Sequence, residues 1–204
     1  MAEKKLIHII DDEDSFRRSA SFMLRASGFA VETWPTGPAF LTAMNRVERG
    51  CILLDFRLPE MDGLKFQAAL FDHHVAMPII FLTGHGNISV AVQAMKAGAV
   101  DFLEKPCEQS VLLAAIKSAF ERLAAADERA ARTAEAEDIL SILTAREREV
   151  LEGLAQGLPK KTIAYDLGIS PRTVEVYRAN LMAKLDVHSL SDALRIAFAA
   201  GMGH

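Results

Sequence analysis

The 204-residue sequence predicts an α/β domain followed by a smaller all-α domain. In roughly the first 125 residues, five short apolar runs alternate with segments of helical periodicity, which is typical of a parallel sheet covered by helices on both faces. From about residue 143 onward the segments all have helical periodicity, and glycines separate several of them. An Ala-rich stretch without glycine or proline joins the two regions and predicts a helical linker.

The five apolar runs predict the strands of the first domain. Their length and their flanking turn residues suit strands that are buried on both faces. We expect the strands at residues 6–10, 29–33, 51–55, 78–82 and 100–103, and helices at about residues 14–27, 35–47, 63–73, 88–97 and from 108 onward.

Composition favours a globular protein of the cytoplasm. Half of the residues are hydrophobic and a quarter are charged. No run of eighteen apolar residues exists, which argues against a membrane span, and the short apolar run near the N-terminus ends in acidic residues, which argues against a signal peptide. Cys51 and Cys107 lie far apart without the spacing of metal ligands, which fits a reducing compartment.

Reactive side chains stand at the carboxyl ends of four predicted strands. Asp11 and Asp12 follow the first strand, Asp55 ends the third, Thr83 follows the fourth, and Lys105 follows the fifth. Ligands of open α/β sheets bind at the carboxyl ends of the strands, so we expect these side chains to meet at one edge. Taken singly, each has an ordinary interpretation as a helix cap, a turn residue or a surface charge.

Together, these side chains predict phosphoryl chemistry. The aspartates offer the hard oxygen ligands that Mg²⁺ prefers. Asp55 can act as a nucleophile towards phosphorus and form an acyl phosphate. Phosphoryl transfer needs positioning and neutralisation of the phosphoryl oxygens, for which the Lys105 ammonium and the Thr83 hydroxyl are suited.

Residues 6–120 resemble a two-component receiver domain. The resemblance rests on Ile-Ile-Asp11-Asp12-Glu13, Leu-Leu-Asp55-Phe-Arg-Leu-Pro59-Glu-Met-Asp-Gly63, Phe-Leu-Thr83-Gly-His-Gly, Ala94-Met-Lys-Ala-Gly98-Ala-Val-Asp-Phe102 and Leu-Glu-Lys105-Pro106. It implies a flavodoxin-like (βα)5 fold with a cis bond between Lys105 and Pro106. It also implies that Asp55 is the phosphoacceptor, that Asp11, Asp12 and Asp55 hold Mg²⁺, that Thr83 and Lys105 contact the phosphoryl group, and that Phe102 is the aromatic switch residue.

Two positions depart from the receiver pattern. Phe102 has no hydroxyl where many receivers have tyrosine, so switching must work by packing. Cys107 stands where an aromatic or aliphatic residue is usual. Neither departure touches the assignment of the phosphoacceptor.

The linker predicts a helix that continues past the edge of the first domain. Strong helix formers fill it. Two interpretations are open: a coiled-coil dimer seam, or a solvated helix without a partner. The candidate seam residues are Leu112, Ile116, Ala119, Leu123, Ala126 and Ala130. We expect a receiver at residues 1–122, a helical linker at 123–138 and the second domain at 139–204.

The second domain has the pattern of a helix-turn-helix. Thr144 and Glu147 predict a capping box at its first helix, and Ser170 followed by Pro171 predicts the start of a later one. Residues 141–204 hold 8 Lys/Arg and 7 Asp/Glu, a net charge of only +1, so DNA contact requires a local patch. An ordinary helical bundle is the alternative. The later helix is expected to bury Val174, Tyr177, Leu181 and Leu185 and to expose Arg172, Glu175, Val176, Arg178, Ala179 and Met182.

Residues 143–199 are similar to the four-helix LuxR/NarL-type DNA-binding domain. The matching stretches are Leu-Thr-Ala-Arg-Glu-Arg-Glu-Val-Leu, Ile163-Ala-Tyr-Asp-Leu-Gly-Ile-Ser170-Pro-Arg-Thr-Val-Glu-Val and Ala183-Lys-Leu, and the chain looks closest to the FixJ branch. The resemblance makes the helix from Pro171 the recognition helix, and it implies a dimer contact through Leu190 and Leu194. Candidate DNA-binding residues are Lys160, Lys161, Arg172, Thr173, Glu175, Val176, Arg178, Ala179, Asn180 and Lys184.

The sequence therefore predicts a response regulator that controls transcription. A sensor histidine kinase is expected to phosphorylate Asp55, and the product is expected to form a homodimer on DNA. One rival is a haloacid-dehalogenase-like phosphatase, which would need an aspartate where Arg57 stands. The other is a DNA-binding protein whose receiver only dimerises, against which the complete set of strand-end residues argues.

Overall fold

The structure is a computed structural model that describes residues 5–84 and 88–203. The chain divides into two compact units, Met1–Ala125 and Ala126–His204, called here the N-terminal unit and the C-terminal unit. Each has its own hydrophobic core. Within the described ranges, no helix combines the length and apolar character needed to cross a membrane.

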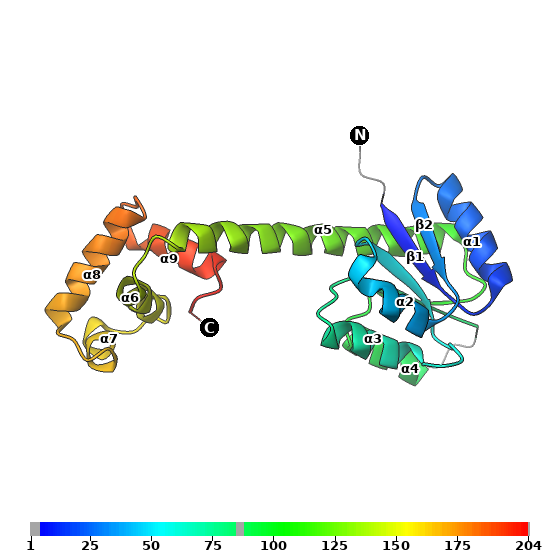
Figure 1. Ribbon diagram of the computed structural model, residues 1–204, viewed down its shortest axis with the longest axis horizontal. Coiled ribbons are helices and arrows are strands. Elements are labelled where there is room, and N and C mark those ends of the chain that lie inside the picture. The colour runs from blue at the N-terminus through cyan, green and yellow to red at the C-terminus, as the bar shows by residue number, and fades with distance from the viewer. Residues whose placement is uncertain (1–4, 85–87, 204) are drawn as a thin grey trace. The chain divides into compact units, whose positions relative to one another are not determined.

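The N-terminal unit is built on a parallel five-stranded sheet (Figure 1). The strand order β2-β1-β3-β4-β5 is that of a doubly wound fold, as the alternation of strands and helices predicts. The strands are β1 (Leu6–Ile10), β2 (Ala30–Trp34), β3 (Cys51–Asp55), β4 (Ile79–Thr83) and β5 (Asp101–Glu104). Three of them begin one residue later than the sequence predicts.

Helices cover both faces of the sheet, and β3 shows why. Cys51 and Leu53 join a core with α1 (Asp14–Ala26) and α5 (Gln109–Leu140). The alternate residues Ile52 and Leu54 join a second core with α2 (Gly37–Ala43), α3 (Gly63–Asp72) and α4 (Ile88–Lys96). Successive side chains of a strand point to opposite faces, so a strand that is apolar throughout feeds two cores.

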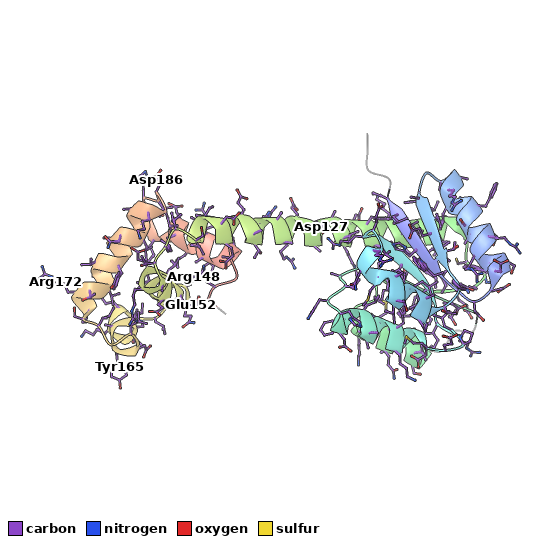
Figure 2. All side chains as sticks on the ribbon, viewed as in Figure 1. Asp127, Arg148, Glu152, Tyr165, Arg172 and Asp186 are labelled. Carbon is purple, nitrogen blue, oxygen red and sulfur yellow. The ribbon has the colours of Figure 1, made fainter. Side chains whose placement is uncertain are left out.

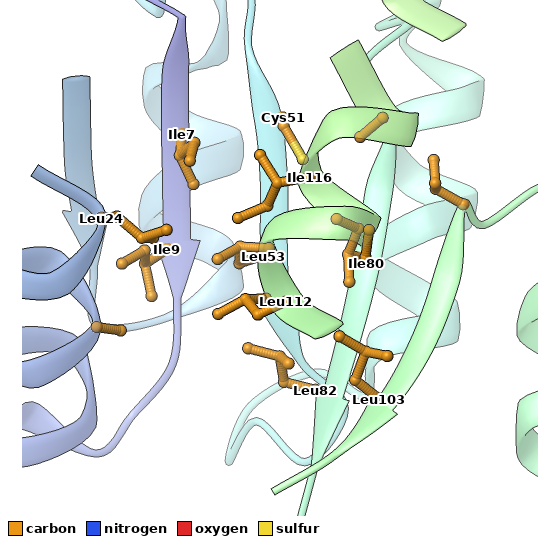
Figure 3. Packing of buried hydrophobic residues seen from close by; sticks show 14 of the residues in the cluster. Ile7, Ile9, Leu24, Cys51, Leu53, Ile80, Leu82, Leu103, Leu112 and Ile116 are labelled. Atoms are coloured by element: carbon orange, nitrogen blue, oxygen red, sulfur yellow. The ribbon is translucent and has the colours of Figure 1, made fainter. Parts of the chain in front are cut away.

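Figure 3 shows the first of these cores at close range. Leu24 of α1 lies beside Ile9 of β1, and Leu112 and Ile116 of α5 lie over Leu53 and the neighbouring strands. All five side chains are nearly or fully excluded from solvent. The sheet is therefore closely packed against α1 and α5 on this face.

The second helix is shorter than the sequence predicts. We expect it over residues 35–47, but α2 begins at Gly37 and gives way after Ala43 to a 3-10 turn, η1 (Met44–Arg46). The Thr36 hydroxyl accepts a hydrogen bond from the backbone N–H of Ala39, which fixes the helix start at that cap. Gly37 is buried, and a Cβ there would lie 3.0 Å from the ring of Phe66.

The long linker helix is confirmed as α5, with 32 residues. Its first half does not form a dimer seam, because Leu112, Ile116 and Ala119 are buried in the core of the N-terminal unit. Residues 124–132 are all exposed. Ala136 and Leu140 are buried again, in the C-terminal part of the helix, and Leu140 belongs to the core of the C-terminal unit.

The C-terminal unit contains four further helices after α5. They are α6 (Ala145–Ala155), α7 (Lys160–Asp166), α8 (Pro171–Lys184) and α9 (Leu190–Ala199). The predicted capping box is confirmed: the Thr144 hydroxyl accepts from the Glu147 backbone N–H, and the Glu147 carboxylate accepts from the Thr144 backbone N–H. Gly153 lets α7 approach α6 closely, since a Cβ there would lie 2.8 Å from Ile163.

Candidate functional site

Five of the six predicted site residues of the first domain gather at the carboxyl edge of the sheet. Asp11 and Asp12 follow β1, Asp55 ends β3, Thr83 ends β4, and Lys105 follows β5. Because parallel strands end at the same edge, the register that pairs β1 with β3 and β3 with β4 brings these positions together.

Lys105 is the link between the acidic groups. Its Nζ donates to Asp11 Oδ2 and to Asp55 Oδ2, each at 2.6 Å. The side chains of Lys105, Asp11 and Asp55 are 15%, 1% and 13% exposed. Burial lowers the pKa of Lys105, but the hydrogen bonds and charges of the two aspartates outweigh it and leave that pKa raised, so the ammonium stays charged.

The remaining oxygens of the two aspartates are held by backbone groups. Asp11 Oδ1 accepts from the N–H of Glu13 at 2.9 Å, and Asp55 Oδ1 accepts from the N–H of Arg57 at 2.8 Å. Burial raises the pKa of Asp11, and its hydrogen bonds from Lys105 and Glu13 oppose that rise. Each carboxylate is thus fixed in orientation by one backbone donor and one ammonium.

The three aspartates fit a divalent cation. Asp11, Asp12 and Asp55 each offer a carboxylate oxygen, and these oxygens lie within 4.8 Å of one another. Asp12 is exposed, whereas Asp11 is buried. An all-oxygen donor set of carboxylates open to water on one side is what Mg²⁺ prefers, so the residues present fit this ion.

The loop after Asp55 is shaped by a required glycine. A Cβ at Gly63 would lie 2.6 Å from the ring of Phe81, so only glycine fits where α3 begins. The backbone N–H of Gly63 donates to the carbonyl of Phe56 at 3.0 Å, and the Asp62 carboxylate caps α3. The Pro-Glu-Met-Asp-Gly motif is therefore a compact turn beside the acidic site.

The predicted switch residue Phe102 lies in a cluster of aromatic rings. Its ring centroid is 6.2 Å from that of Phe56 and 6.0 Å from that of Phe81. Phe102 is only half-buried, unlike Phe81. Thr83 is fully buried at the end of β4, and its carbonyl accepts a hydrogen bond from the backbone N–H of Lys105. The Thr-Gly-His-Gly motif that begins at Thr83 continues into residues 85–87, which lie outside the described part of the chain.

The C-terminal unit presents α8 much as the sequence predicts. Ser170 caps the helix and Pro171 occupies its first turn. Val174, Leu181 and Leu185 are buried, and Tyr177 packs against the same core. Figure 2 shows Arg172 projecting away from this unit, and Tyr165 projects from α7. The predicted contact residues Val176, Ala179 and Asn180 are exposed, while Met182, expected on the outer face, packs partly against the core.

Several predicted DNA-binding side chains already have partners. Lys160 Nζ lies 3.0 Å from the Glu175 carboxylate, which Arg178 also approaches at 3.6 Å. Lys184 Nζ donates at 2.7 Å to the carboxylate of Glu147, whose side chain is 4% exposed. The hydrogen bond from Lys184, together with those of the capping box, holds the pKa of Glu147 below its usual value.

The remaining candidate residues lie on α7, α8 and α9. Lys161 and Thr173 occupy the first turns of α7 and α8, where Lys161 is exposed and Thr173 half-buried. Leu190 and Leu194 on α9 are half-buried, whereas Ala193 and Ala197 of the same helix belong to the core. The two leucines therefore keep apolar surface that the C-terminal unit does not use itself.

Comparison with known families covers both units. Residues 7–117 match the response regulator receiver domain. The chain belongs to the response regulator family. Residues 141–197 match the luxR family of bacterial regulatory proteins, so the receiver of this response regulator is joined to a LuxR-type DNA-binding domain.

Relatives match this response regulator over nearly its whole length. It is 48% identical over 200 residues to the transcriptional regulatory protein FixJ of Rhizobium meliloti (strain 1021), covering 97% of each chain. It is 39% identical to the response regulator protein TodT of Pseudomonas putida, covering 94% of this chain and 84% of that protein. Among solved structures, full-length FixJ from B. japonicum matches with a TM-score of 0.62 and 42% identity, covering 98% of each chain.

The response regulator StyR also resembles the whole chain. Its structure matches with a TM-score of 0.72 and 38% identity, covering 96% of this chain and 99% of that one. The chain is thus a response regulator with a LuxR-type helix-turn-helix, a class of transcription regulators in which phosphorylation and dimerisation are typical. Its family indicates a sensor kinase and DNA as partners.

Two side chains contact lysines of these sites in a way that the sequence does not predict. The ring of Phe16 lies 4.1 Å from Lys105 Nζ, measured to its centroid. Glu147 was assigned only to a helix cap, but it also binds Lys184 of α8. No sequence signal marks either contact, because each depends on how two helices or a helix and a loop are packed.

Proposed function

We propose that Asp55 accepts a phosphoryl group from a sensor histidine kinase in the presence of Mg²⁺, and that the phosphorylated protein dimerises and binds DNA to activate transcription. The observation that carries this proposal is the Lys105 ammonium, which joins Asp11 and Asp55 at 2.6 Å each at the carboxyl edge of the sheet. The protein would act in the cytoplasm, where its DNA target lies.

In this mechanism the Asp55 carboxylate attacks phosphorus while the bond from phosphorus to the histidine nitrogen of the kinase breaks. The backbone N–H of Arg57 orients Asp55 throughout. Lys105 moves its charge from the aspartate to a phosphoryl oxygen. Asp11, Asp12 and Asp55 would hold Mg²⁺, which neutralises phosphoryl oxygens when bound. No group on this protein gains or loses a proton in this step.

Phosphorylation would be communicated through α4. The new anionic oxygens attract the Thr83 hydroxyl at the end of β4, and the half-buried Phe102 repacks beside Phe56 and Phe81. Helix α4 exposes Ile88, Val92 and Met95, an apolar surface suited to a second receiver. The homodimer would form through this surface.

The dimer would place two copies of α8 on DNA half-sites about one helical turn apart. Arg172, Thr173, Val176, Ala179 and Asn180 are suited to base edges in the major groove, because this side of α8 is turned away from its core. Lys160 and Lys161 at the start of α7 are suited to phosphates. On binding, Glu175 and Arg178 would give up their contact with each other and contact DNA instead. Leu190 and Leu194 would form the contact between the two copies of the C-terminal unit.

The test is phosphorylation of full-length protein by acetyl phosphate and Mg²⁺, followed by size-exclusion chromatography and a gel-shift assay with selected DNA. We expect the wild type to incorporate one phosphoryl group and to dimerise, and Asp55→Asn to do neither. Glu60→Gln is the matched control, because it removes an exposed acid from the same loop. Incorporation that survives in Asp55→Asn would refute the assignment, and release of free phosphate at many turnovers would favour a phosphatase.

A further inference from the structure

Phe16 of α1 packs partly against the core and also reaches the acidic site. Its spacing with Ala20 and Leu24 predicts a core position, and those two residues are buried. Phe16 is only half-buried and reaches the acidic site, where its ring centroid lies 4.1 Å from Lys105 Nζ. This separation is well within the range at which an ammonium is attracted to the face of an aromatic ring.

The ring completes the surroundings of the Lys105 ammonium. An ammonium has three N–H groups. Two point to the carboxylates of Asp11 and Asp55, and the ring of Phe16 lies against the same nitrogen. With 15% of its side chain exposed, Lys105 has little contact with water. Carboxylates and an aromatic face therefore take the place of most of its hydration.

The neighbouring residue Arg17 joins the start of α1 to the end of β1. Its Nη1 donates to the carbonyl of Asp11 at 2.7 Å, and its Nη2 donates to Asp14 at 3.0 Å. The bond to the Asp11 carbonyl joins the start of α1 to the backbone that carries Asp11, and the bond to Asp14 lies within α1. The backbone that carries Phe16 is therefore held beside the acidic site.

We propose that Phe16 is a positioning residue for phosphoryl transfer, holding the Lys105 ammonium where it can pass from Asp55 to the incoming phosphoryl group. The lysine side chain is a flexible four-carbon chain with many conformers. The ring occupies the space on the α1 side, so the conformers that remain keep the charge beside Asp55. This inference rests on the proposed role of Asp55 as the phosphoacceptor.

The experiment compares Phe16→Leu and Phe16→Tyr in the full-length protein. Leucine keeps apolar bulk but has no aromatic face, whereas tyrosine keeps the face. With acetyl phosphate as donor, the rate of Asp55 phosphorylation should fall about fivefold to thirtyfold in Phe16→Leu and stay within about twofold of wild type in Phe16→Tyr. A small donor removes kinase docking from the result. Phe22→Leu, which changes an exposed phenylalanine of the same helix, is the control.

A double-mutant cycle separates positioning from general stability. In a Lys105→Met background, Phe16→Leu should have no further effect on the rate, because its effect acts through the ammonium. An equal loss in both backgrounds overturns the inference. The inference is also overturned if Phe16→Leu leaves the phosphorylation rate unchanged. If Asp55→Asn has lost all incorporation in the same assay, the proposed function still stands. Absence of incorporation at Asp55 in the wild type refutes both.

Discussion

His8, in the middle of the interior strand β1, is a titratable residue that is fully buried and is not used by the candidate site. Its Nε2–H donates to the Glu48 carbonyl at 2.9 Å, and its Nδ1 accepts from the indole N–H of Trp34 at 3.4 Å. Both contacts suit the neutral ring. Burial lowers the pKa of His8, and Glu48 and Glu32 oppose that effect only in part.

The N-terminal unit should therefore lose stability in mild acid. The unfolded chain, with a His pKa near 6.5, binds a proton more readily than the folded chain, so stability is complete above about pH 6.5 and falls as the pH drops towards the lower folded pKa. The fluorescence of Trp34, the single tryptophan, reports unfolding of this unit. The melting temperature should fall from pH 7 to pH 5.5, and His8→Gln should remove much of that slope. An equal slope in His8→Gln would contradict the prediction.

Residue types at strand ends were enough to predict most of the candidate site. Asp11, Asp55 and Lys105 could be placed together because a parallel sheet brings its carboxyl ends to one edge. The contact of Phe16 with Lys105 could not be predicted, since it depends on the rotation of α1 and on which way a flexible lysine turns.

Among the helices, the predictions held where local signals were strong. The capping box of α6 and the Ser170-Pro171 start of α8 were confirmed because their hydrogen bonds are formed within a few residues. The extent of α2 was wrong, since Thr36 competes as a cap and the chain tightens into η1. The hydrogen bond from Lys184 to the buried Glu147 joins α8 to α6. Lys184 therefore contributes to the packing of these two helices, besides any contact with DNA.

The outer side of α8 yields a direct test of DNA recognition. Arg172 is exposed at its N-terminal turn. Arg172→Ala should weaken binding to selected DNA about tenfold at constant salt, because an arginine that reaches a base or phosphate contributes about 1–3 kcal/mol. Fluorescence anisotropy with labelled duplex measures this change. Arg195→Ala, at an exposed arginine of α9 paired with Asp192, should leave affinity nearly unchanged. Equal losses in the two variants would argue against α8 as the reading helix.

At the scale of the whole molecule, the two-part organisation could be predicted, and the two compact units divide within the predicted linker. We expect domains at residues 1–122 and 139–204 with a linker between them, while the compact units meet at Ala125 and Ala126, inside α5. Glycine and proline normally mark such boundaries, and α5 has neither. The boundary depends instead on which turns of one helix are buried, and burial is set by the cores at its two ends.

The exposed middle of α5 makes the chain vulnerable to cutting there. Residues 124–132 have no core to hold them, and a helical segment of this length is marginally stable by itself, so it opens locally far more often than the ends of α5. It carries Arg129 and Arg132, both exposed. Brief digestion with trypsin should cut at these arginines first and leave two folded fragments, identified by mass spectrometry. Early cleavage at Lys117 instead, within the turns packed on the sheet, would contradict this prediction. A cell protease with the same preference would separate the acidic site of the N-terminal unit from the C-terminal unit in a single cut.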